Sequence, residues 1–95
     1  MGVSQNWFDQ GITLFSKRDL TGAIASFDKA ILFNQSPDEA WYNRGIIFAQ
    51  RGNNIKALQS FDQTLSRDPG NENAKKARTM ILNRMKNQKT TTIFG

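Results

Sequence analysis

Apolar residues recur along most of the chain at the three- and four-residue spacing of helices that bury one face. The spacing predicts helices at about 4–18 and 20–33, and a third that ends near Gln50. A fourth helix is capped by Asn53 or Asn54 and ends before Asp68, and a fifth runs from about Asn71 to Lys86 or beyond. The pattern therefore predicts an all-α chain of five helices.

Short polar motifs mark where these helices begin and end. Ser4 and Asp19 are expected N-caps, and Ser36–Glu39 has the serine, proline and glutamate of a capping box. Arg51-Gly52 is typical of a helix closed by glycine, and Asp68–Asn71 is a breaker. The connections are short, so neighbouring helices should run antiparallel.

An internal repeat of 34 residues relates the first helix pair to the second. The identical positions include Trp7/Trp41, Gly11/Gly45, Ala23/Ala57, Ser26/Ser60, Phe27/Phe61 and Asp28/Asp62. Chance recurrence is the alternative, but both tryptophans of the chain take part. A mid-helix glycine is costly, so its recurrence suggests a close helix crossing, with Ala23 and Ala57 expected to face the two glycines. Such a period is typical of stacked helical repeats.

These residues resemble the tetratricopeptide repeat (TPR) family, whose pattern places Trp and Gly on the first helix and Ala and Phe on the second. Departures are few: Leu14 and Phe48 replace a tyrosine, Thr64 replaces an alanine, and Pro37 lies two residues late. The resemblance implies an α-solenoid of antiparallel helix pairs. It divides a domain at 1–89 into repeat one (4–37), repeat two (38–71) and a capping helix (72–88), followed by a flexible tail at 90–95.

Composition argues against an enzyme or a metal protein. The chain has no cysteine and no histidine, which removes disulfides, thiolate sites and the commonest general acid and base. No glycine-rich phosphate loop is present, so we expect no catalysis and no cofactor. No apolar run approaches the roughly 20 residues of a membrane span. The first residues do not resemble a secretory signal, and we expect a soluble cytoplasmic protein.

The positive charge is confined to the end of the chain. Through Pro69 there are seven basic and seven acidic residues. From Gly70 onwards there are six basic residues and one acidic residue, Glu72. This asymmetry leaves an alternative function open, in which the basic fifth helix binds nucleic acid or an anionic membrane surface. That helix has no exposed aromatic residues for base stacking, which makes nucleic acid the weaker prediction.

In the family, the first helices of successive units line a groove that binds peptides or partner helices. Transferred by alignment, the groove residues are Phe8, Ile12, Phe15, Tyr42, Asn43, Ile46, Lys76, Met80, Asn83 and Arg84. The lysines and asparagines with which some members grip a C-terminal carboxylate are mostly missing, so an apolar or helical ligand with acidic groups near Lys76 and Arg84 fits better. The alternative is that the chain itself buries Phe8, Ile12 and Phe15.

The leading interpretation is a non-catalytic scaffold that binds a protein partner. Two units and a cap lie at the lower size limit of a solenoid, so self-association into a homo-oligomer is a further expectation. The tail has strand propensity and no helix signal, and docking of Ile93 and Phe94 into a groove is the alternative to a free tail.

Overall fold

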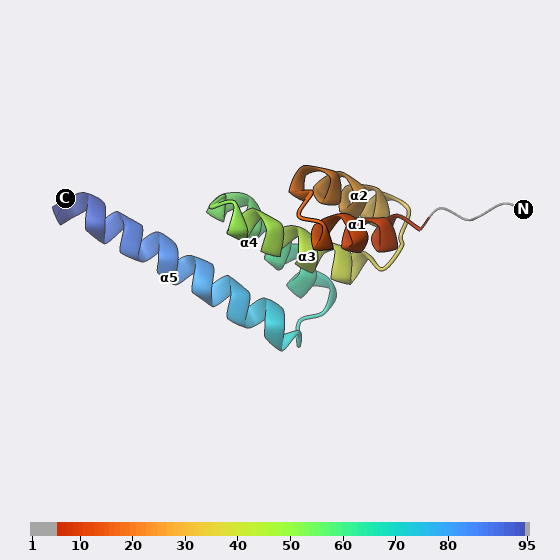
Figure 1. The fold of residues 1–95 in the computed structure, drawn as a ribbon. Coiled ribbons are helices and arrows are strands. Elements are labelled where there is room, and N and C mark those ends of the chain that lie inside the picture. The colour runs from red at the N-terminus through yellow and green to blue at the C-terminus, as the bar shows by residue number, and fades with distance from the viewer. Residues whose placement is uncertain (1–5, 95) are drawn as a thin grey trace, which may run out of the picture.

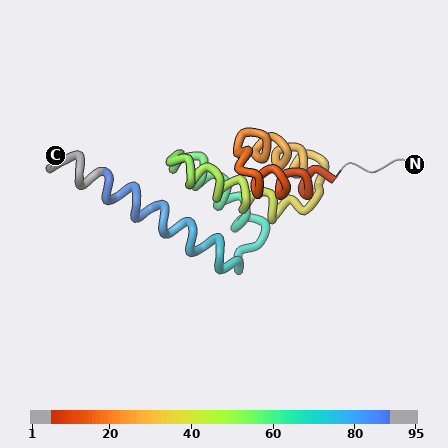
Figure 2. Tube along the Cα trace, viewed as in Figure 1, coloured from red at the N-terminus to blue at the C-terminus, as the bar shows by residue number. Residues whose placement is uncertain are grey.

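The computed structural model describes the backbone of residues 6–94 and the side chains of residues 6–88. Its elements are all helices: α1 (Trp7–Ser16), α2 (Leu20–Leu32), α3 (Pro37–Gln50), α4 (Asn54–Arg67) and α5 (Glu72–Phe94). Figure 1 shows α1 with α2 and α3 with α4 as successive pairs. The tube in Figure 2 shows α5 running out beyond the second pair. The predicted all-α helical-repeat fold is confirmed.

Four of the helices begin at asparagine or aspartate caps, including α5, where Asn71 Oδ1 accepts from Ala74 N at 2.9 Å. The Asp19 carboxylate accepts from Gly22 N at 2.9 Å, and the Asn53 amide oxygen accepts from Lys56 N at 3.1 Å. Both caps satisfy a donor that the first helical turn leaves open. The cap of α1 is Asn6, which accepts from Asp9 N, while the predicted cap Ser4 lies outside the described residues.

The capping box predicted at Ser36 is wrong. Ser36 has a left-handed backbone (φ 47°), and its side chain makes no cap hydrogen bond. The cause is the tight closure of α2 immediately before it, where Gln35 N donates to Ala30 O at 2.8 Å and Asn34 is also left-handed. Pro37 does occupy the first turn of α3, as predicted.

The first helix of each pair closes in the same way, 34 residues apart. Gly52 (φ 77°) follows α3, and the next residue donates to Phe48 O at 2.8 Å. Arg18 (φ 66°) follows α1, and the next residue donates to Leu14 O at 2.9 Å. Glycine adopts this conformation without cost and arginine does not, so the repeat preserves the geometry even where the residue changes.

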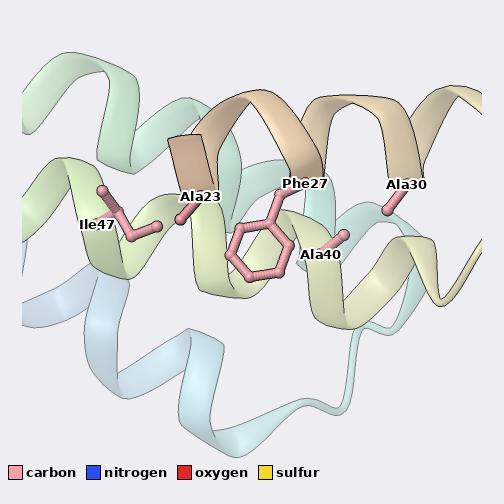
Figure 3. Close-up of a cluster of buried hydrophobic side chains, with 5 residues drawn as sticks. All are labelled: Ala23, Phe27, Ala30, Ala40 and Ile47. Carbon is pink, nitrogen blue, oxygen red and sulfur yellow. The ribbon is translucent and has the colours of Figure 1, made fainter. Parts of the chain in front are cut away.

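The core consists of two clusters in series. The first contains Ala23, Phe27 and Ala30 of α2 with Ala40 and Ile47 of α3, and Figure 3 shows the Phe27 ring between these two helices. The second cluster contains Phe48, Ala57, Phe61, Ala77 and Ile81. Each cluster joins one pair to the element that follows it, as stacking of repeats requires.

The two mid-helix glycines make room for phenylalanine rings. A Cβ on Gly11 would lie 2.6 Å from Phe27 Cε1, and one on Gly45 would lie 2.6 Å from Phe61 Cε1. Both rings are fully buried. The prediction of a close approach is confirmed, but the atoms nearest the glycines belong to these rings rather than to Ala23 and Ala57.

An ion pair between successive units also follows the repeat. Arg44 Nε lies 2.7 Å from Asp28 Oδ1, and Arg78 Nε lies 2.6 Å from Asp62 Oδ1. In each pair the aspartate is on a second helix and the arginine is on the first helix of the next unit. By this ion pair, α5 takes the place that the first helix of a third unit would have.

The backbone of α5 extends further than the sequence predicts. Residues 90–94 continue the helix, whereas a tail without helix signal was expected there. Propagation fixes one residue for each new hydrogen bond, and no proline or glycine interrupts the segment before Gly95. The side chains of Ile93 and Phe94, for which docking was an alternative, lie outside the described residues.

Candidate protein-interaction surface

The ten predicted binding residues lie on α1, α3 and α5, and we call them the first-helix surface. One row, at the 34-residue offset, contains Ile12, Ile46 and Met80. All three are apolar. Ile12 is 40% exposed and Met80 is 59% exposed, while Ile46 is half-buried against the second cluster. Water-exposed apolar side chains at corresponding sites of three helices form a candidate contact for another chain.

A second row changes character along the molecule. Phe8 and Tyr42 are half-buried, with ring centroids 5.7 Å from Phe27 and 5.8 Å from Phe61. The equivalent residue on α5 is Lys76, which is exposed and forms no ion pair with any side chain that the structure describes. Phe8 and Tyr42 therefore help to hold their helix pairs together, and only part of each ring remains for a ligand.

The outer residues of this surface line two shallow hollows. Ile12 and Phe15 line a hollow of about 390 Å³ on α1. Lys76, Met80 and Asn83 line another of about 400 Å³ on α5. Both hollows are mainly apolar, and both also have basic residues in the lining: Arg18 in the first, and Lys75 and Lys76 in the second.

A third hollow, of about 430 Å³, lies between the start of α3 and the start of α5. Tyr42 and Asn43 line it together with Asp38, Glu39 and Asp68. Asn43 Nδ2 also donates to Glu39 O at 3.0 Å, which ties its amide to its own helix. Seven of the ten predicted residues thus line three separate hollows, whereas Phe8, Ile46 and Arg84 line none of the three.

Arg84, which was predicted to steer a ligand, also makes hydrogen bonds within the chain. Its Nη1 donates to Ala49 O at 3.0 Å and to Asn54 Oδ1 at 3.3 Å. These bonds fasten α5 to the end of α3 and the start of α4. A ligand that used Nη1 would have to compete with them.

A larger hollow was not predicted from the sequence. It measures about 980 Å³ and lies between the α3–α4 turn and the last described side chains of α5. Ile55, which is 57% exposed, lines it. The 34-residue offset aligns Ile55 with Thr21. This change from a polar to an apolar residue is the sequence feature that could have indicated the hollow.

The described residues offer little for chemistry. They contain no group of three histidine, cysteine, aspartate or glutamate side chains arranged to hold a metal ion. None of the helices among them combines the length and apolar character needed to cross a membrane.

Part of the chain matches a known protein family. Residues 38–71, which span α3, α4 and the following turn, match the model of the tetratricopeptide repeat. No curated protein matches the chain.

Proposed function

Because the chain is a TPR-like repeat protein, we propose that it binds a peptide or helix of another protein on the first-helix surface. Repeats of this family generally mediate protein–protein interactions and typically form non-catalytic modules. Stacked helix pairs present extended faces on which partners dock. The proposal assigns that task to the surface made by α1, α3 and α5.

The row of Ile12, Ile46 and Met80 is the main support. Covering the exposed parts of Ile12 and Met80 would contribute roughly 2 kcal/mol. That contribution alone gives weak binding, so a partner must also use the hollows on either side, including the aromatic edges of Phe8 and Tyr42.

The ion pairs of α5 weigh against the alternative of a nucleic-acid or membrane helix. Arg78 is paired with Asp62, Lys75 with Glu72, and Arg84 donates to a backbone carbonyl. Cations engaged in this way would have to give up their partners before they could meet a phosphate. Protein binding requires no such exchange.

Photo-crosslinking tests the proposal. A crosslinking amino acid at position 80 should capture a partner in cells, and the variant Ile12→Glu/Ile46→Glu should abolish the capture. Leu32→Glu is the matched control, because Leu32 is 74% exposed on α2, away from the first helices. Capture that survives the double variant, or that is equally sensitive to Leu32→Glu, would contradict the proposal.

Self-association through the same surface is part of this proposal. Two copies would cover the apolar row of each other, and Met80→Glu should then convert a dimer into a monomer in light scattering. A monomer for the unmodified protein at micromolar concentration would leave only the hetero-partner form of the proposal.

A further inference from the structure

We infer that the protein has a second docking surface, a notch between the α3–α4 turn and α5 that binds an acidic segment of a partner protein. The notch is the hollow of about 980 Å³, and Arg51, Asn54, Ile55, Met85, Lys86 and Gln88 line it. It is separate from the first-helix surface, since none of the ten residues predicted for that surface lines it.

The notch exists because α5 departs from the repeat. In the second pair, the chain turns after Gln50, at residues 51–53. Residues 85–87 are equivalent to that turn, yet they are helical, and α5 continues past the α3–α4 pair (Figure 1). The first pair has no such overhang. The helix that packs against it, α3, ends at Gln50, which the 34-residue offset aligns with the end of α1 at Ser16. An overhanging helix beside a turn leaves a recess that neither element fills.

Hydrogen bonds across its floor hold the notch in shape. Arg84 Nη1 donates to Ala49 O and to Asn54 Oδ1, and Asn54 Nδ2 donates to Gln88 Oε1 at 3.2 Å. These bonds link the end of α3, the start of α4 and the overhanging part of α5. A recess held in this way loses little conformational entropy when a ligand enters, which favours binding.

The charge of the lining selects the partner. Among the residues that the structure describes, Arg51 and Lys86 are the charged side chains of the lining, and none of these lining residues is a carboxylate. The start of α4, whose backbone dipole is positive at this end, lies in the same place. The chain as a whole is also basic, with a net charge of +5. A partner with carboxylates is therefore attracted, and a second copy of the basic α5 is repelled.

The apolar part of the lining distinguishes a protein segment from nucleic acid. Ile55 is 57% exposed, and Met85 is half-buried beside it. An aliphatic pair of this kind suits a leucine or phenylalanine of a peptide. The described residues of the lining include no aromatic ring on which a base could stack. The volume lies within the range of about 300–1,000 Å³ that is usual for ligand sites.

A pair of labelled synthetic peptides tests the inference by fluorescence anisotropy with the full chain. Both are about 12 residues long with a central Leu-Phe, and one carries flanking glutamates where the other carries glutamines. The glutamate peptide should bind about tenfold more tightly than the glutamine peptide, because only it meets Arg51 and Lys86 with opposite charge.

Two variants locate the binding in the notch. Arg51→Glu/Lys86→Glu should weaken binding of the glutamate peptide by about tenfold or more. Ile55→Thr, which restores the residue of the first pair, should weaken both peptides alike by roughly threefold to tenfold. Lys17→Glu is the matched control, since Lys17 is equivalent to Arg51 on the pair without an overhang, and it should leave both affinities unchanged.

Several results would overturn the inference. They are equal binding of the two peptides, no measurable binding of the glutamate peptide, and unchanged binding in the Arg51→Glu/Lys86→Glu variant. Tighter binding of a DNA duplex of similar length than of the glutamate peptide would assign the notch to nucleic acid instead. A dimer that Ile55→Thr dissociates would assign it to a second copy.

Discussion

Replacing Gly45 with alanine should destabilise the protein, although alanine is the better helix former. Gly45 lies in the middle of α3, where alanine is favoured by about 1 kcal/mol. Helix propensity alone therefore predicts a rise in Tm of about 4–8 °C for a chain of this size. The structure predicts a fall in Tm instead, because the Phe61 ring lies where the new methyl group would have to fit.

The size of the effect follows from the distances. The new Cβ would lie 2.6 Å from Phe61 Cε1 and 2.8 Å from Cδ1, whereas carbons in contact prefer about 3.5–4.0 Å. The ring would have to move by about 1 Å, but Phe61 is fully buried and packs against Tyr42. Overpacking of this kind costs about 1–3 kcal/mol. After the gain in helix propensity, we expect a net loss of about 1 kcal/mol in the free energy of unfolding.

Thermal and urea unfolding, followed by circular dichroism, measures this loss in two backgrounds. In the unmodified protein Gly45→Ala should lower Tm by about 4–8 °C. In a Phe61→Leu background the clash with the ring is removed, so Gly45→Ala should be neutral or stabilising. Gly11→Ala repeats the test in the first pair, against Phe27. A higher Tm for Gly45→Ala, or the same effect in both backgrounds, would refute the reasoning.

Three smaller changes test the ends of the helices and the ion pairs, each by thermal unfolding. Arg18→Gly should raise the free energy of unfolding by about 1 kcal/mol, because Arg18 has the left-handed backbone that Gly52 has in the second pair. Asn53→Ala should lower it by about 1 kcal/mol, because the first turn of α4 loses its cap. Asp62→Asn should lower it by less than about 1 kcal/mol, and by less again in high salt, because Asp62 and Arg78 are both substantially exposed.

Most of the fold could be predicted because helix periodicity and the 34-residue offset depend on the chain alone. The cap at Asp19 and the closure at Gly52 could be predicted because each depends on the type of one residue and on the helical turn next to it. Ser36 could not be predicted in this way. Its backbone is determined by how the preceding helix closes, and four residues of connection leave no room for both an extended cap and that closure.

The site was harder to predict, because it depends on which face of each helix the packing leaves open. The offset places Phe8, Tyr42 and Lys76 in one row, but it does not reveal that the two rings lie partly on the core. Arg84 was predicted to face a ligand, yet a backbone carbonyl 35 residues away binds it. The notch escaped prediction because it depends on how α5 lies beside the α3–α4 turn, which the spacing of residues along the chain does not determine.

In the 34-residue register, α5 differs from α3 at the positions where a second helix packs. In α3, Gly45 lets the Phe61 ring of α4 approach the backbone closely. The equivalent residue in α5 is Thr79, which is exposed, and Lys75 stands where α3 has Trp41. A second helix could not approach α5 as α4 approaches α3, because the threonine side chain fills the space that the glycine leaves. We therefore propose that α5 closes the array, and that a partner reaches it from the first-helix surface or from the notch rather than as a missing repeat helix.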